Sequence, residues 1–333
     1  FRSRASVFDH FCGGISEEDC LPVMEKMFTK GVCSVLDYSV EGKEDEIEFD
    51  AAMKKTLKII EFAKEKKAIP FAVFKPTGFG RFDLYKKIGK KKPLTFEEHA
   101  EWDRVVARYE AVCKFAHEKD VALLIDGEES WMQDAADELV LQMMQKYNKE
   151  KAIVFNTLQM YRWDRLDYLK KLHEQAKTEG FYIGMKLVRG AYMEKENKRA
   201  EEKGYPSPIC ESKQATDENY DAAVTYMVEN IDKMAIFAGT HNELSSYKLM
   251  ELMKSKGLAA NDERIWFGQL YGMSDNISYN LAANGYNVAK YLPFGPVRDV
   301  MPYLIRRAEE NTSVAGQTSR ELMRSEELRV GKE

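Results

Sequence analysis

Two adjacent arginines, Arg306 and Arg307, are the residues of this sequence best suited to bind an anion. They lie in Tyr303–Asn311, a segment with helical character that follows the last apolar segment of the chain. Adjacent helical positions point about 100° apart, yet two long planar guanidinium groups can both reach one carboxylate. The pair therefore indicates an anionic substrate. The alternative is a surface helix on which the arginines form ion pairs with Glu309 and Glu310.

Lys75 and Asp126 each end an apolar segment, which would place their charges at the edge of a dry interior. Lys75 could act as a third cation for the substrate or as a Schiff-base nucleophile. Alternatively, it extends its ammonium group to solvent at the rim of the fold. Asp126 would pair with Lys75 or with an arginine and hold the cations in place, or it would cap a helix.

Two more segment ends carry hydrogen-bond donors. In Lys186–Tyr192, strand alternation directs the side chains of Lys186 and Arg189 to opposite faces, and Gly190 would permit the close approach of a flat ligand. Thr240-His241-Asn242 offers groups suited to a phosphate, a ribose or a purine edge. The alternatives are structural ion pairs for the two cations and a satisfied rim histidine.

These polar residues follow short apolar segments that alternate with longer, charged segments of helical periodicity. Such alternation is typical of βα units. About eight strands are expected, which is the number in a (β/α)8 TIM-like barrel, an α/β fold whose active site lies at the carboxyl ends of the strands. The expected strands are Val32–Tyr38, Ile69–Lys75, Val121–Asp126, Ala152–Gln159, Tyr182–Val188, Met234–Thr240, Arg264–Tyr271 and Asn287–Tyr291.

The longer segments have apolar residues at every third or fourth position, as expected for helices outside a barrel. We predict one catalytic barrel domain over residues 1–333, with an N-terminal helical arm at 1–30, the barrel at 31–311 and a tail at 312–333. The helix with the two arginines would lie over the barrel mouth. The expected outer helices include Phe96–Lys119, Met132–Lys149, Leu166–Glu179 and Asp217–Lys233.

The composition disfavours several classes of protein. A net charge of −5 over 333 residues provides no basic excess for nucleic acid. The five cysteines are dispersed and no histidine pair has metal spacing, so we expect a reducing compartment and no metal. No apolar stretch reaches the ~20 residues of a membrane span. The basic run at 86–92 indicates a solvated loop or, alternatively, a peripheral membrane contact.

Four segments resemble, in the same order, the characteristic segments of the flavin-dependent proline dehydrogenases. The similarity extends from Phe1 to Asn311, which is nearly the whole chain. It implies a flavoenzyme on a (β/α)8 barrel that binds FAD without a covalent bond. The segments are Lys186–Tyr192, Phe267–Met273, Tyr291–Gly295 and Tyr303–Asn311.

The resemblance also implies roles for individual residues. Asp126 and Lys186 would be the catalytic candidates, the first as electrostatic support for the substrate site and the second near flavin N5. The order of Lys186 and Arg189 is exchanged relative to many bacterial members, which leaves their separate roles open. The residues that would bind the substrate carboxylate and wall the proline ring are Lys75, Tyr291, Tyr303, Arg306 and Arg307. Those that would contact FAD are Gln159, Arg189, Gly190, Ala191, Thr216, Thr240 and His241.

The reaction implied by the resemblance transfers a hydride from C5 of L-proline to N5 of the flavin and yields Δ1-pyrroline-5-carboxylate, the first step of proline catabolism. The electrons would pass to a quinone, and a separate pyrroline-carboxylate dehydrogenase would take the product. The protein would be cytoplasmic or peripheral on an inner membrane, on the matrix side in a eukaryote.

Two other functions are compatible with the same residues. A barrel lyase would form a Schiff base between a small keto acid and Lys75 or Lys186. A binding module without chemistry would require every charged strand end to be structural, and the number of converging positions disfavours it.

Overall fold

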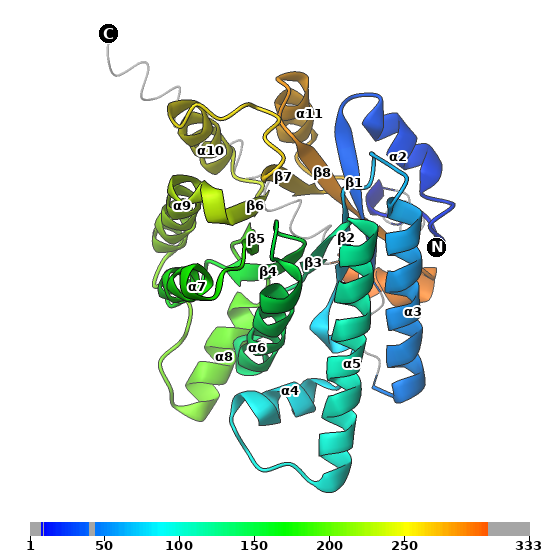
Figure 1. Ribbon diagram of the computed structural model, residues 1–333, viewed down its shortest axis with the longest axis vertical. Coiled ribbons are helices and arrows are strands. Elements are labelled where there is room, and N and C mark those ends of the chain that lie inside the picture. Colours follow the sequence, from blue (N-terminus) through cyan, green and yellow to red (C-terminus); the bar gives the residue numbers. More distant parts are fainter. Residues whose placement is uncertain (1–7, 9, 40–43, 306–333) are drawn as a thin grey trace.

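Eight parallel strands form a closed barrel in the computed structural model, which describes residues 8, 10–39 and 44–305 (Figure 1). Each strand pairs with its neighbours in the sequence, and β1 closes the barrel against β8. The predicted α/β barrel is therefore confirmed. The strands are β1 Val32–Tyr38, β2 Phe71–Phe74, β3 Ala122–Ile125, β4 Val154–Gln159, β5 Ile183–Val188, β6 Met234–Gly239, β7 Ile265–Leu270 and β8 Val288–Phe294.

The predicted strands coincide with these elements, and β1 matches residue for residue. Strand β8 was predicted to end at Tyr291 but continues to Phe294, through Pro293. Proline is tolerated here because β7 ends opposite Tyr291, so beyond that point no strand on the β7 side requires an N–H donor. The carbonyl of Pro293 instead accepts a hydrogen bond from Gly13 N at 2.8 Å.

Helices surround the barrel, with each predicted outer helix present to within a few residues (Figure 1). Phe96–Lys119 matches its prediction at both ends, because Thr95 and Glu98 form a capping box and Asp120 ends the helix in a left-handed conformation. The helices are α2 Leu21–Phe28, α3 Glu46–Ala63, α4 Phe82–Gly89, α5 Phe96–Lys119, α6 Ser130–Tyr147, α7 Arg165–Glu179, α8 Met193–Lys203, α9 Lys213–Glu229, α10 Glu243–Ser255 and α11 Asp275–Ala283.

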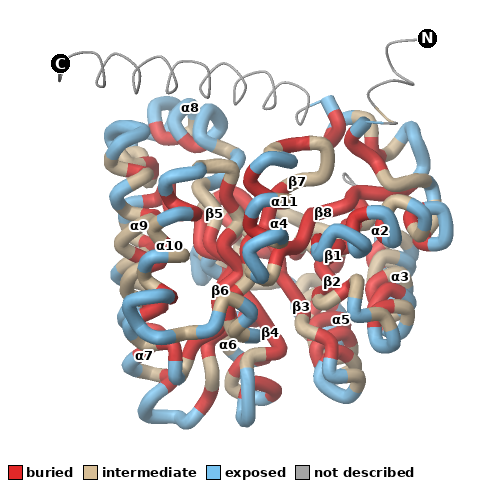
Figure 2. Tube along the Cα trace, turned by 90° about the horizontal axis from the view of Figure 1, so that it is seen from above, coloured by how far each residue is buried: buried red, intermediate tan, exposed pale blue. Residues whose placement is uncertain are grey.

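The core has two layers, one between the strands and the outer helices and a smaller one inside the barrel. Inside, Phe71 makes edge-to-face contacts with Phe155, Phe237 and Trp266, at ring-centroid distances of 5.6, 5.2 and 5.3 Å. Figure 2 shows the strands almost entirely buried, with exposed residues confined to the outer helices and loops. The barrel interior is therefore packed, and a ligand must bind at its mouth.

A third apolar cluster joins the two ends of the described chain. Phe11 and Cys12 pack against Val300, Tyr303 and Leu304, which belong to a helix at 297–305. Arg306 and Arg307, together with the predicted tail at 312–333, lie outside the described residues. Within the part of the chain that is described, no helix combines the length and apolarity required to cross a membrane.

Candidate active site

Asp126, the residue after β3, lies between two lysines at the carboxyl end of the barrel. Its Oδ2 accepts a hydrogen bond from Lys75 Nζ at 2.7 Å, and its Oδ1 accepts one from Lys186 Nζ. Lys186 Nζ also donates to the hydroxyl of Tyr291 at 3.0 Å, and that hydroxyl donates to Asp126 Oδ1 at 3.3 Å. The predicted pairing of Asp126 with Lys75 is thus present. Asp126 does not cap α6, whose N-cap residue is Glu129.

Burial and ion pairing act in opposite directions on these groups. Burial alone would raise the pKa of Asp126, but Lys186 and Lys75 outweigh it and hold that pKa far below its usual value. Burial would lower the pKa of Lys75, yet Asp126 and Asp37 outweigh it and raise that pKa. For Lys186, burial prevails over Asp126 and lowers the pKa. Lys75 is therefore held in its charged form, and Lys186 is the easier lysine to deprotonate.

Asp37, near the end of β1, is a fourth charged residue of this group that the sequence prediction missed. It is 3% exposed, and Ser39 Oγ donates to its Oδ2 at 2.7 Å. Burial raises its pKa against the opposing effect of Lys75. A single acidic residue near the end of an apolar strand was the available indication, as it was for Asp126.

Glu128 links the charge cluster to neighbouring loops, and it too was missed as a site residue. Thr77 Oγ1 donates to its Oε1 at 2.6 Å, and Tyr192 OH donates to its Oε2 at 3.0 Å. Burial raises the pKa of Glu128, and Lys75 partly opposes this change. Glu128 therefore holds together the segments that follow β2, β3 and β5.

Tyr303 enters the same region from the helix at 297–305. It is 4% exposed and interacts electrostatically with Lys75 and Tyr291. A cavity of about 340 Å³ is lined among others by Asp37 and Lys75 from the barrel and by Asp299 from the helix at 297–305. This volume falls within the ~300–1,000 Å³ typical of small-molecule sites.

The predicted cofactor residues form a second group, at the adjoining ends of β4, β5 and β6. Arg189 donates from Nη1 to Thr240 Oγ1 at 2.9 Å and from Nη2 to Ser245 Oγ at 3.0 Å. Asp217 accepts from its Nε at 2.6 Å. The guanidinium plane is therefore fixed from three sides. Gln159 pairs with Val188 in the β4–β5 ladder, one residue before Arg189.

The remaining predicted cofactor residues flank this group. His241 follows Thr240, and its Nδ1 lies 2.8 Å from Ser274 Oγ in a hydrogen bond. Thr216, which is buried, precedes Asp217 in α9, and its hydroxyl donates to the Ser212 carbonyl at 3.2 Å. Residues from four different elements thus converge beside the barrel end. Gly190 and Ala191, by contrast, expose their backbone at the surface.

Gly190 has a physical requirement that differs from the predicted one. Its φ is +130°, and a Cβ atom there would lie 2.5 Å from the ring of Tyr161. The glycine thus makes room for a tyrosine ring, whereas the sequence suggested room for a flat ligand. The Tyr161 hydroxyl is itself buried. Across those residues, no group of three or more potential ligands is arranged to hold a metal ion.

Comparisons with known proteins agree with this geometry. A sequence model of the family described as Proline dehydrogenase matches residues 20–320. The carbapenem antibiotics biosynthesis protein CarD of Pectobacterium carotovorum subsp. carotovorum is 38% identical over 323 residues, which cover 96% of this chain and 83% of that protein. Human mitochondrial proline dehydrogenase 1 is 40% identical over 240 residues, covering 70% of this chain and 40% of the human protein.

Among solved structures, the chain is similar to proline utilization A (PutA) from Bdellovibrio bacteriovorus inactivated by N-propargylglycine. The TM-score is 0.81 at 24% sequence identity, over 92% of this chain and 33% of that one. At this identity the likeness establishes the fold. The chain therefore spans a third of the PutA protein and less than half of the human relative.

Proposed function

We infer that this chain, which belongs to the proline dehydrogenase family, oxidises L-proline to Δ1-pyrroline-5-carboxylate with FAD as its cofactor. The observation that carries this proposal is the Lys75–Asp126–Lys186 cluster at the barrel mouth, in a chain matched by the family model over residues 20–320. A buried site with two lysines and one ionised aspartate favours an anionic ligand.

The proposed substrate site uses the charge cluster together with Tyr303, from the helix at 297–305, and the two arginines that follow in the sequence. Lys75 would bind the proline carboxylate with Arg306 and Arg307, both outside the described residues. Tyr291 and Tyr303 would wall the pyrrolidine ring. Asp126 would keep Lys75 charged and in place, as the 2.7 Å ion pair supports.

The donors at the ends of β4, β5 and β6 fit a flavin dinucleotide. Arg189 and Thr240 offer a cation and a hydroxyl for the anionic portion. Lys186 would lie near the reactive end of the ring system. FAD bound by these residues would supply the hydride acceptor for C5 of proline. The full set proposed to hold it is Gln159, Arg189, Gly190, Ala191, Thr216, Thr240 and His241.

The protein would accelerate the reaction by orientation more than by proton abstraction. The ion pairs hold the pKa of Asp126 far below its usual value despite burial, so its carboxylate is a weak base. A carboxylate clamped by cations and a ring held between two tyrosines would instead fix C5 in a reactive position.

Further parts of the proposal concern partners and location. We propose that electrons leave to a membrane quinone, that a separate pyrroline-carboxylate dehydrogenase takes the product, and that contact with the membrane is peripheral. Relatives named as mitochondrial support a mitochondrial location in a eukaryotic source. There we propose that the protein lies on the matrix side of the inner membrane, and in a bacterial source in the cytoplasm. CarD is named for antibiotic biosynthesis, so the product's fate could be biosynthetic as well as catabolic.

The test is anaerobic reduction of the FAD-loaded protein by L-proline without nicotinamide. We expect loss of the flavin absorbance and formation of the pyrroline product. Arg306→Ala and Arg307→Ala should each weaken proline binding by ~1.5–3 kcal/mol, the scale of a hydrogen bond to a charged group. Arg298→Ala, which removes an exposed arginine from the helix at 297–305, is the matched control. A flavin absorbance that proline leaves unchanged would overturn the proposal.

The contacts of the two lysines argue against the Schiff-base alternative. A lysine nucleophile must lose its proton, whereas Asp126 and Asp37 outweigh burial and raise the pKa of Lys75. Lys186 has a lowered pKa but donates to both Asp126 and Tyr291. Trapping with borohydride and a keto acid should therefore leave both lysines unmodified.

A further inference from the structure

Helix α8 lies beside the barrel mouth between two glycines with positive φ, Gly190 and Gly204. Of its eleven residues, only Glu196 and Ala200 are buried, and Met193 at its start is 53% exposed. Apolar burial thus contributes little to its attachment. Its position must depend on polar contacts.

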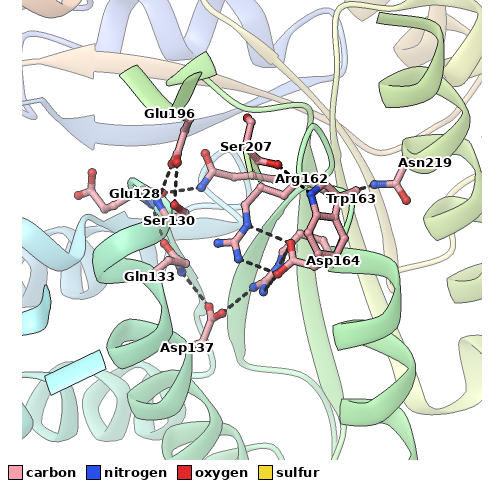
Figure 3. Close-up of polar contacts among 12 residues, drawn as sticks. Glu128, Ser130, Gln133, Asp137, Arg162, Trp163, Asp164, Glu196, Ser207 and Asn219 are labelled. Carbon is pink, nitrogen blue, oxygen red and sulfur yellow. Dashed lines mark hydrogen bonds and ion pairs between the residues drawn. The ribbon is translucent and has the colours of Figure 1, made fainter. Parts of the chain in front are cut away.

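Those contacts go to four consecutive residues at the junction of β3 and α6. Glu196 accepts two hydrogen bonds from Ser130, as Figure 3 shows. Lys195 pairs with Glu129 at 3.1 Å. Just before the helix, Tyr192 OH donates to Glu128 at 3.0 Å. Near its end, the Arg199 guanidinium lies 4.6 Å from the ring centroid of Trp131.

Glu196 makes the most buried of these contacts, with 0% of the residue exposed. Its Oε1 accepts from Ser130 N at 2.6 Å and its Oε2 from Ser130 Oγ at 2.7 Å. Ser130 is the first residue of α6, and the N-cap residue Glu129 makes no capping hydrogen bond with its own side chain. A carboxylate from α8 therefore caps the amino end of α6, where negative charge is stabilised.

The same junction holds the proposed active site. Asp126, two residues before Glu128, binds Lys75 and Lys186. Glu128 also accepts from Thr77 and, through its backbone N, donates to Gln133, which continues a buried polar network behind the site (Figure 3). Displacement of α8 would pull Tyr192 away from Glu128 and move the Arg189–Ala191 backbone that precedes it.

We propose that α8 is a lid over the substrate and flavin sites and that Glu196 is the positioning residue that latches it to Ser130. In the latched state Tyr192 and the Arg189–Ala191 segment stand in place for binding. In the released state, Gly190 and Gly204 absorb the change of backbone direction. This inference rests on the proposed function.

The test compares Glu196→Ala with Glu196→Gln and with Glu201→Ala, which removes an exposed carboxylate from the same helix. The rate of backbone hydrogen exchange in residues 193–203 measures how firmly α8 is attached, and this measurement does not depend on catalytic activity. Steady-state kinetics with L-proline report its effect on the site. The alanine variant removes two hydrogen bonds to a charged acceptor, so α8 should exchange at least about tenfold faster and KM should rise by at least about tenfold. We expect a smaller change in kcat.

Glutamine retains an acceptor for Ser130 N, so Glu196→Gln should restore most of the protection and of the KM. Glu201→Ala should behave as the wild type does. Unchanged exchange of α8 in Glu196→Ala overturns the latch, and faster exchange with unchanged KM overturns its role in binding. If that variant fails to fold, Ser130→Ala, which removes the hydrogen bond from Ser130 Oγ, replaces it, and wild-type exchange and KM in Ser130→Ala then refute the proposal. If the wild-type protein does not oxidise proline, the proposed function is wrong. The hydrogen-exchange result would still test whether Glu196 holds α8 in place.

Discussion

Replacement of Asp126 by alanine is the most informative perturbation of the charge cluster. This carboxylate is the common partner of Lys75 and Lys186, and the side chains are 11, 20 and 8% exposed, respectively. Because all three are well shielded from water, solvent screening reduces their interaction little. Removal of the carboxylate leaves two neighbouring ammonium groups without their anion.

The expected cost follows from this geometry. Removal of one partner from a buried ion pair typically costs ~3–5 kcal/mol, since the remaining charge is neither solvated nor paired. Asp126→Ala should therefore lower the free energy of unfolding by ~3–5 kcal/mol. Asp126→Asn keeps the volume and one acceptor but not the charge, so its loss should be smaller. Adding Lys186→Met to Asp126→Ala should recover part of the loss, because one unpaired charge is then gone.

Equilibrium urea unfolding of each variant at several pH values supplies the measurement. The pKa of Asp126 is lowered on folding, because its lysine partners outweigh burial. Its contribution to stability is therefore fully present above the unfolded-state pKa of ~3.9 and is lost as the pH falls toward the folded-state value. The difference between wild type and Asp126→Asn should be constant from about pH 5 to 7 and shrink below about pH 4.

Activity gives the second readout. Without its anion, Lys75 is neither fixed nor kept charged, so kcat/KM for L-proline should fall by about tenfold or more. Glu61→Gln is a control for the loss of surface ion pairs, because the exposed Glu61 pairs with Lys64 and Lys119 on the barrel exterior. If Asp126→Ala unfolds at the wild-type urea concentration and retains its kcat/KM, the cluster does not have the role we assign to it.

Two further predictions concern the neighbouring groups. Arg189→Ala should reduce the flavin retained after gel filtration, measured as the ratio of flavin to protein absorbance. The reason is that the variant lacks the guanidinium group that Asp217, Thr240 and Ser245 hold in place for the cofactor. Full retention of flavin would show that Arg189 is not part of the cofactor site. Asp37→Asn should be increasingly stabilised relative to the wild type as the pH rises above ~4. Burial raises the folded-state pKa of Asp37, so the free energy of unfolding of the wild type falls as the pH rises from ~4 toward that folded-state pKa. Parallel pH profiles of the two proteins would contradict this prediction.

Much of the fold could be predicted because its determinants are local. The capping box at Thr95 and Glu98 and the left-handed Asp120 define α5 within the sequence itself. The end of β8 could not be predicted in the same way. Whether Pro293 is acceptable in a strand depends on where β7 ends, and this is a property of the register between strands.

The residues of the site also differ in whether local sequence is enough to predict them. Lys75 and Asp126 could be predicted to lie close together because a parallel barrel brings all of its strand ends to one side. The role predicted for Lys186 came from the resemblance to the proline dehydrogenases. Glu196 was missed because its segment, Met193–Lys203, is rich in Lys and Glu and is typical of a solvated helix. Its buried role depends on Ser130, 66 residues away in sequence. A contact of that kind has no local pattern.

The charge balance of the cluster also explains why an anion should bind there. Lys75 and Lys186 contribute two positive charges, and the ionised Asp126 offsets only one of them. Asp37 lies in the same cluster, and burial raises its pKa against the opposing effect of Lys75, so its carboxyl group offsets the lysine charges less than an exposed aspartate would. A buried excess charge is unfavourable until a partner arrives. A substrate carboxylate would complete the pairing, and the energy stored in the incomplete cluster would then appear as binding affinity for an amino acid.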